Sequence, residues 1–108
     1  DLNETKNLLL DNEIKLDQIN LFDVEKNINI SEKIDLVISL KSMGYHYPIE
    51  TYMNLFKKNC SQDVVFIFDI SKGNYDNISL ERIFKKVEVI YEESSIHPLN
   101  RLFCKGLI

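Results

Sequence analysis

The chain has 108 residues, 44% hydrophobic and 28% charged, which is ordinary for a single soluble globular domain. Its formal net charge is -4 and no basic block interrupts it, which argues against nucleic-acid binding as the main activity. No signal peptide is visible, no apolar run approaches the roughly 18 residues that cross a membrane, and Cys60 and Cys104 lack CxxC spacing, a pattern typical of a reduced cytoplasmic protein.

The first third of the chain predicts a helix, a strand and a polar connection. Residues 4–10 form a short helical segment that ends near a cluster of leucines, and Asp11-Asn12 is a turn signal. Residues 14–22 show partial alternation of apolar and polar side chains, which predicts a strand. Residues 23–33 are polar and predict a loop with room for one helical turn.

The centre of the chain predicts a strand, a loop and a helix. Residues 34–40 are an almost continuous apolar run with β-branched side chains, which indicates a strand buried on both faces. Residues 41–48 are short, polar and aromatic, and Gly44 and Pro48 favour a loop. Helical spacing follows over residues 49–58. In open α/β sheets ligands bind outside the carboxyl ends of the strands, so this loop is the first candidate site.

The next elements repeat the alternation. Residues 64–68 predict a second strand buried on both faces, closed by Asp69. Residues 71–77 form a loop. Ser79 is suited to be the N-cap of a short helix over residues 80–85.

Two strands are predicted at the end of the chain, over residues 87–91 and 101–107. The connection of about nine residues between them favours an antiparallel pair, because parallel strands need a longer crossover. Strands that alternate with helices elsewhere predict a mostly parallel sheet. The expected fold is therefore a single α/β domain over residues 1–108, with a mostly parallel sheet and an antiparallel C-terminal strand.

This order of elements resembles the carboxyl-terminal two thirds of a class I, S-adenosylmethionine-dependent methyltransferase. The resemblance covers essentially the whole chain and is closest to the sugar O-methyltransferases of bacteria. The segments that carry it are DLVISL at 35–40, GYHYP at 44–48 and ETY at 50–52. In this resemblance the five predicted strands, at 14–22, 34–40, 64–68, 87–91 and 101–107, are the third to the seventh strand.

The resemblance implies a Rossmann-like methyltransferase sheet and methyl transfer from S-adenosylmethionine to a hydroxyl of a sugar or glycoconjugate. The chain departs from the family because no GxGxG loop is present; its three glycines are Gly44, Gly73 and Gly106. That loop brings the backbone close to the cofactor, which requires residues without Cβ. We therefore expect the N-terminal part of the domain to be absent from this sequence and the chain to act as part of a longer protein.

The resemblance also implies cofactor-binding residues. Asp1 would accept hydrogen bonds from the ribose hydroxyls, since a carboxylate offers acceptors for two donors. Asp23 would meet the adenine amino group and Phe22 the adenine face. Ser39 and Leu40 end the strand whose backbone passes the transferred methyl group. The alternatives are a disordered terminal residue for Asp1, a turn or helix cap for Asp23, and a core residue for Phe22.

The acceptor side of the predicted reaction lies in the loop over residues 41–48. His46 and Tyr45 are the catalytic candidates, because methyl transfer to a hydroxyl needs a base and histidine titrates near neutral pH. Tyr47 is expected to contact a sugar ring. Asp69 is expected either to orient the substrate or to cap the following loop. The alternative for His46 is a histidine that bonds a nearby carbonyl, and His97 is expected at the surface.

The sequence leaves two other classes of protein open. One is a catalytically silent α/β interaction domain that kept a methyltransferase-like fold. The other is a receiver-like module, against which the serine, leucine and lysine at 39–41 count, because a receiver should carry an acidic cluster at its early strand ends. The expected partner is a small-molecule or sugar substrate, without nucleic acid, membrane or metal, and homo-oligomerisation is left open.

Overall fold

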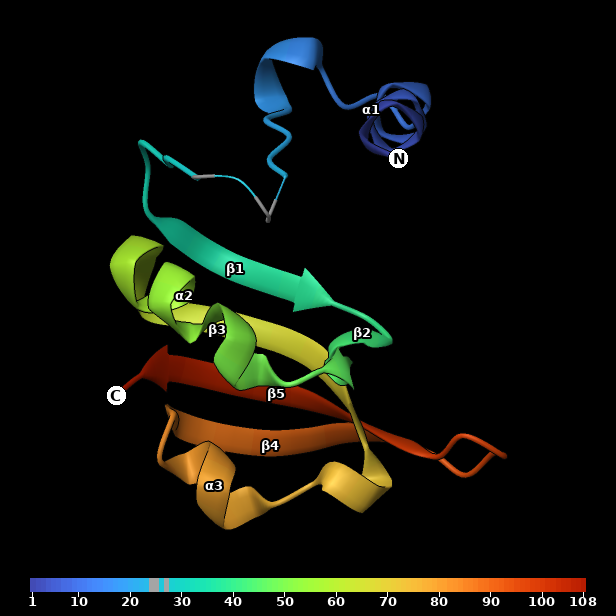
Figure 1. The fold of residues 1–108 in the computed structure, drawn as a ribbon, viewed down its shortest axis with the longest axis vertical. Helices are drawn as coiled ribbons and strands as arrows, with labels where there is room; N and C mark the ends of the chain where they lie inside the picture. The colour runs from blue at the N-terminus through green and yellow to red at the C-terminus, as the bar shows by residue number, and fades with distance from the viewer. Residues whose placement is uncertain (24–25, 27) are drawn as a thin grey trace. The chain divides into compact units, whose positions relative to one another are not determined.

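The protein is described by a computed structural model that covers residues 1–23, 26 and 28–108. The chain forms two compact units, Asp1–Ile30 and Ser31–Ile108, each of which is described by itself (Figure 1). The larger unit contains the sheet.

The unit Asp1–Ile30 begins with helix α1, Leu2–Asp11, where a helix was predicted. Asp1 is its N-cap, and its Oδ1 accepts the Asn3 N–H at 2.8 Å. The strand predicted over residues 14–22 is wrong. The structure has a short 3₁₀ helix there, η1 (Leu16–Gln18), and no described residue of this segment lies in a strand.

Local hydrogen bonding explains the difference. The Lys15 N–H donates to Gln18 Oε1 at 3.2 Å and the Gln18 N–H donates to the Lys15 carbonyl at 2.9 Å, which closes a turn. The alternating side chains gain little from a strand here, since Leu16 is 59% exposed. The helical turn left open within residues 23–33 falls partly on residues 24, 25 and 27, which lie outside the described residues.

The unit Ser31–Ile108 is built on a four-stranded mixed sheet. Its strands are β1 (Ile34–Ser39), β3 (Cys60–Ser71), β4 (Phe84–Glu93) and β5 (Leu99–Leu107). They are hydrogen-bonded in the order β1-β3-β5-β4 (Figure 1). β1 pairs with β3 in parallel, whereas β5 pairs antiparallel with both β3 and β4.

The prediction of a mostly parallel, Rossmann-like sheet is therefore wrong, because only one hydrogen-bonded pair of this sheet is parallel. The antiparallel pairing of the last two strands was predicted and is present. The difference comes from the place of β5. It follows β4 after residues 94–98 and lies between β3 and β4, so it separates two strands that run in the same direction.

The remaining elements connect these strands. They are β2 (Ser42–Tyr47), η2 (Ile49–Tyr52), α2 (Met53–Asn59), η3 (Lys72–Asn74) and α3 (Asn77–Glu81). The predicted loop over residues 41–48 thus contains a strand. The last helix begins earlier than predicted because Asp76, not Ser79, is its N-cap. No helix of the described residues is long and apolar enough to cross a membrane.

The core lies between one face of the sheet and the helices α2 and α3. Val64, Phe66, Phe68 and Ile70 alternate along β3 and are buried on this face. Phe66 packs edge-to-face against Phe56 of α2, with ring centroids 4.9 Å apart. Aromatic packing therefore holds α2 against this face of the sheet.

The other face of the sheet is more exposed than the sequence predicted. Leu36 and Ile38 of β1 are 52% and 58% exposed, so the expectation that residues 34–40 are buried on both faces is wrong. β1 is an edge strand of the sheet. Val37 and Ser39, which point to the opposite face, are partly buried beside Phe66 and Phe68.

Burial in the core also changes the pKa of the Cys104 thiol. Cys104 is fully buried on β5, and burial raises its pKa from 9.0 to about 12. The neutral thiol is therefore favoured in the folded state, and its contribution to stability is present below pH 9.0 and lost as the pH rises towards about 12.

We expect the free energy of unfolding to fall by about 1.4 kcal/mol more per pH unit in the wild type than in Cys104→Ala between pH 9 and 11. Urea unfolding of both proteins across this range measures the slopes. Other groups that titrate there, Cys60 included, are common to both proteins. Equal slopes would contradict the assignment of a buried neutral thiol.

Candidate functional site

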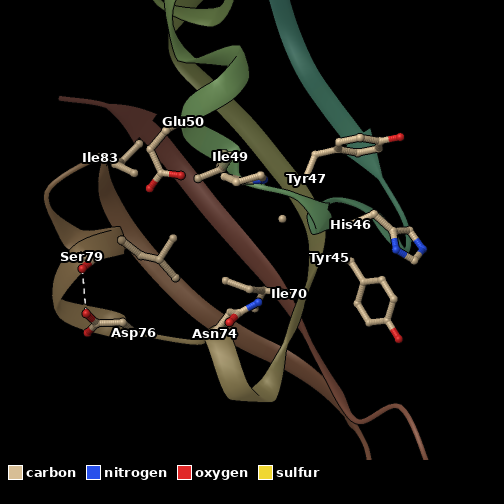
Figure 2. Close-up of a pocket in the computed structure, with 13 residues that line it drawn as sticks. Tyr45, His46, Tyr47, Ile49, Glu50, Ile70, Asn74, Asp76, Ser79 and Ile83 are labelled. Carbon is tan, nitrogen blue, oxygen red and sulfur yellow. Dashed lines mark hydrogen bonds between the residues drawn. The ribbon is translucent and has the colours of Figure 1, made fainter.

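A cavity of ≈ 500 Å³ lies on the helix side of the sheet, a volume within the range of small-molecule sites (Figure 2). One wall comes from β2 and η2, and the other from the end of β3, η3 and α3. The lining residues are Gly44, Tyr45, His46, Tyr47, Pro48, Ile49, Glu50, Ile70, Asn74, Asp76, Ser79, Leu80 and Ile83.

The wall formed by β2 is shaped by the turn that leads into it from β1. Ser39 Oγ accepts the Met43 N–H at 2.9 Å, and Asp69 Oδ2 accepts the Lys41 N–H at 2.9 Å. Lys41 has a φ of 53°, in the left-handed region that is uncommon for a residue with a side chain. Two side-chain acceptors therefore hold this turn.

Gly44 allows β2 to approach β3. Its φ is 79°, and a Cβ at this position would lie 2.9 Å from Cδ2 of Phe68 and 3.1 Å from the Asp69 carbonyl oxygen. Only glycine fits both the backbone conformation and the contact. The cavity wall thus depends on one residue without a side chain.

The opposite wall carries polar groups. The Ser79 hydroxyl donates to Asp76 Oδ2 at 2.7 Å, and the Ile78 N–H donates to Asp76 Oδ1 at 3.1 Å (Figure 2). The Ser79 hydrogen bond is the main reason that the pKa of Asp76 lies below its usual value. Asn74 and Glu50 also line the cavity, and no described lining residue is a lysine or arginine.

The aromatic residues of β2 are part of the cavity lining. The rings of Tyr45 and His46 pack edge-to-face, with centroids 4.8 Å apart and an interplanar angle of 86°. Figure 2 shows both rings on the side of β2 that is away from Asp76 and Ser79. Tyr47 is 54% exposed. The sequence predicted all three as site residues, and the structure brings them together along one short strand.

Asp69 is fully buried and is not among the residues that line the cavity. Its Oδ1 accepts Arg101 Nε at 2.7 Å, and its Oδ2 accepts Arg101 Nη2 at 3.0 Å. The hydrogen bond to Asp69 is the main cause that raises the pKa of Arg101. With Lys41 also donating, the carboxylate has both oxygens occupied, and it lies at the turn before β2.

The residues predicted to bind the cofactor are divided between the two units. Asp1, Phe22 and Asp23 belong to the unit Asp1–Ile30, in which Phe22 is 41% exposed. Ser39 is the last residue of β1 in the unit Ser31–Ile108, and Leu40, which follows it, is 50% exposed.

Two of these residues have hydrogen-bond partners within their own unit. The Asp1 carboxylate caps its own helix, and the Ser39 hydroxyl is used within the turn that leads to β2. The glycines are dispersed: Gly44 lies in β2, Gly73 in η3 and Gly106 in β5. No backbone cradle that a Gly-rich loop would supply is formed by them.

Sequence reasoning missed the polar wall of the cavity. Asp76 was placed within a loop and Ser79 was interpreted only as a helix cap. Aspartate is a common N-cap residue, and Asp76 stands directly before the first residue of α3, which is a helix-start signal. It indicated the helix but not that the cap faces a cavity.

Among the described residues, no group of three or more His, Cys, Asp or Glu side chains is arranged to hold a metal ion. A scan against protein-family models, a search of curated proteins and a search of solved structures each found no match for the chain.

We expect Gly44→Ala to lower the free energy of unfolding by about 1–3 kcal/mol, because the new Cβ strains both the backbone and the Phe68 contact. Gly73→Ala is the matched control, since its Cβ would meet only Ser71 Oγ at 3.9 Å. Urea unfolding measures both variants. Equal stability of the two variants would contradict the close approach of β2 to β3.

Proposed function

We propose that the cavity binds a sugar and that the chain serves an S-adenosylmethionine-dependent methyl transfer to a hydroxyl of a sugar or glycoconjugate. The observation that carries the proposal is a cavity of suitable size whose lining combines aromatic side chains of β2 with carboxylates, an amide and a hydroxyl. The resemblance of residues 35–52 to bacterial sugar O-methyltransferases supplies the reaction.

The polar wall supports recognition of hydroxyl groups. The Glu50 carboxylate is an acceptor for hydroxyl donors, and the Asn74 amide offers both donors and an acceptor. The Ser79 hydroxyl donates to Asp76 Oδ2, so its oxygen can act as an acceptor. Tyr47 also lines the cavity and is half-exposed, so its ring can contact the apolar side of a sugar. With no lysine or arginine among the described lining residues, the cavity favours a neutral or cationic sugar over a phosphorylated one.

In this proposal His46 takes the proton from the acceptor hydroxyl. Histidine is the side chain that most often acts as a general base, and His46 lies on β2 between two tyrosines that also line the cavity. The rings of Tyr45 and His46 pack edge-to-face, a contact that favours this orientation of the imidazole. The methyl donor of the proposal is S-adenosylmethionine, and no step through it is derived from the residues described.

We also place the protein in the cytoplasm. Both cysteines, Cys60 and Cys104, are free, and Cys104 is fully buried in the core. Free thiols are typical of a reducing compartment.

A second function is favoured by the exposed apolar face of β1. Leu36 and Ile38 are both more than half exposed on an edge strand. Such residues are a known feature of strands that contact other proteins. The alternative is therefore a catalytically silent domain that binds a protein partner through this face.

The sugar-binding proposal is tested by titrating ¹⁵N-labelled protein with neutral methyl glycosides. We expect amide shifts confined to residues 44–50 and 74–83. Glu50→Gln should weaken binding about tenfold, because a hydrogen bond to a charged acceptor is lost. Glu88→Gln, on the other face of the sheet, is the control and should bind as the wild type does. Absence of shifts at the cavity would contradict the proposal and leave the interaction domain as the candidate to test.

The reaction is tested with isotope-labelled S-adenosylmethionine and the same glycoside. We expect His46→Ala to lower methyl transfer by about 100-fold or more, the range of general-base catalysis, while glycoside affinity changes much less. Tyr45→Phe, which keeps the edge-on ring, is the matched control and should retain most of the turnover. Unchanged turnover in His46→Ala would exclude His46 as the base.

A further inference from the structure

The Asp69 carboxylate joins three parts of the chain. Arg101 of β5 binds it with two nitrogens, and the Lys41 amide before β2 donates to the same Oδ2 that accepts Arg101 Nη2. Asp69 and Arg101 are also register partners on neighbouring antiparallel strands. The carboxylate is fully buried, so it has no water with which to replace a lost partner.

Arg101 is fixed in turn by its surroundings. Its guanidinium lies over the ring of Tyr91, 5.4 Å from the centroid, and Tyr91 is its register partner on β4. A guanidinium that is bound by a carboxylate on one side and an aromatic ring on the other has little freedom to rotate. The position of the Asp69 carboxylate is thereby set by β4 and β5.

The Lys41 amide links the Asp69 carboxylate to the wall of the cavity. Lys41 has the left-handed φ of 53°, a conformation that persists in a residue with a side chain only when its surroundings hold it. Its N–H is held by Asp69, and its ammonium group lies 3.9 Å from Glu93 of β4. β2, which follows directly, supplies Gly44, Tyr45, His46 and Tyr47 to the cavity wall.

We propose that Asp69, oriented by Arg101, is a positioning residue that holds the Lys41 turn and thereby places the aromatic wall of the cavity. The role in ligand binding rests on the proposed function, whereas the role in the turn does not. Asp69 itself contacts no ligand, because its oxygens are occupied and it does not line the cavity.

Asp69→Asn tests the proposal, because it keeps the shape of the side chain and removes the charge that binds Arg101. We expect the Lys41 amide to exchange with solvent at least about tenfold faster, since a charge-assisted hydrogen bond is lost. The amide shifts of residues 42–47 should change, and affinity for the methyl glycoside should fall about tenfold. Arg101→Lys, which keeps the charge but loses the two-point contact, should give a smaller change of the same kind.

Val65→Ala is the control for loss of stability alone. Val65 lies on the same face of β3 as Asp69, further back along the strand. The substitution Val65→Ala should therefore lower the stability of the fold without changing the contacts of Lys41. In this control the Lys41 exchange rate, relative to the protein's global exchange, should stay as in the wild type. An unchanged Lys41 amide in Asp69→Asn, or an equal change in Val65→Ala, would overturn the positioning role. If the wild type binds no glycoside, the proposed function fails, and the Lys41 amide alone decides the positioning role.

Discussion

Burial of the Asp69 carboxylate is the constraint on which the arrangement around the cavity depends. An ionised carboxylate that leaves water costs several kcal/mol unless charged and hydrogen-bonding groups replace the solvent. Arg101 and the Lys41 amide supply those groups. Arg101 reaches Asp69 only because β5 lies antiparallel beside β3 in the register that pairs the two residues. The strand order, the ion pair and the turn before β2 are therefore parts of one arrangement.

The local part of this arrangement was accessible from the sequence. Apolar runs located the centres of the four strands of the sheet, and the short connection after β4 predicted an antiparallel pair. The position of β5 between β3 and β4 is non-local, because residues far apart in the chain decide it. The apolar run at 34–40 likewise gave no information on which face is covered: Val37 and Leu36 are equally apolar, yet only Val37 packs against the core.

Some residues of the candidate site could likewise be predicted from the sequence, and others could not. The aromatic segment with Gly44 and Pro48 was recognised because its residue types are unusual after a strand, and it does line the cavity. The neighbours of Asp69 were not predictable, since Arg101 lies 32 residues further along the chain. The polar wall was missed for a different reason. Asp76 and Ser79 form an ordinary helix cap, and a cap pattern carries no information on whether it faces solvent or a cavity.

The two candidate functions use opposite faces of the sheet. Ile70 of β3 and Leu80 of α3 line the cavity on the face of the sheet that the helices cover. Leu36 and Ile38 point to the other face with their register partners Val65 and Ile67. A protein bound over Leu36 and Ile38 would therefore leave the cavity open to a small ligand. Asp69 and Arg101 lie on the same face as Leu36, so a partner there would approach the ion pair that holds the Lys41 turn. The turn before β2 thus connects the ion pair on one face of the sheet to the cavity wall on the other.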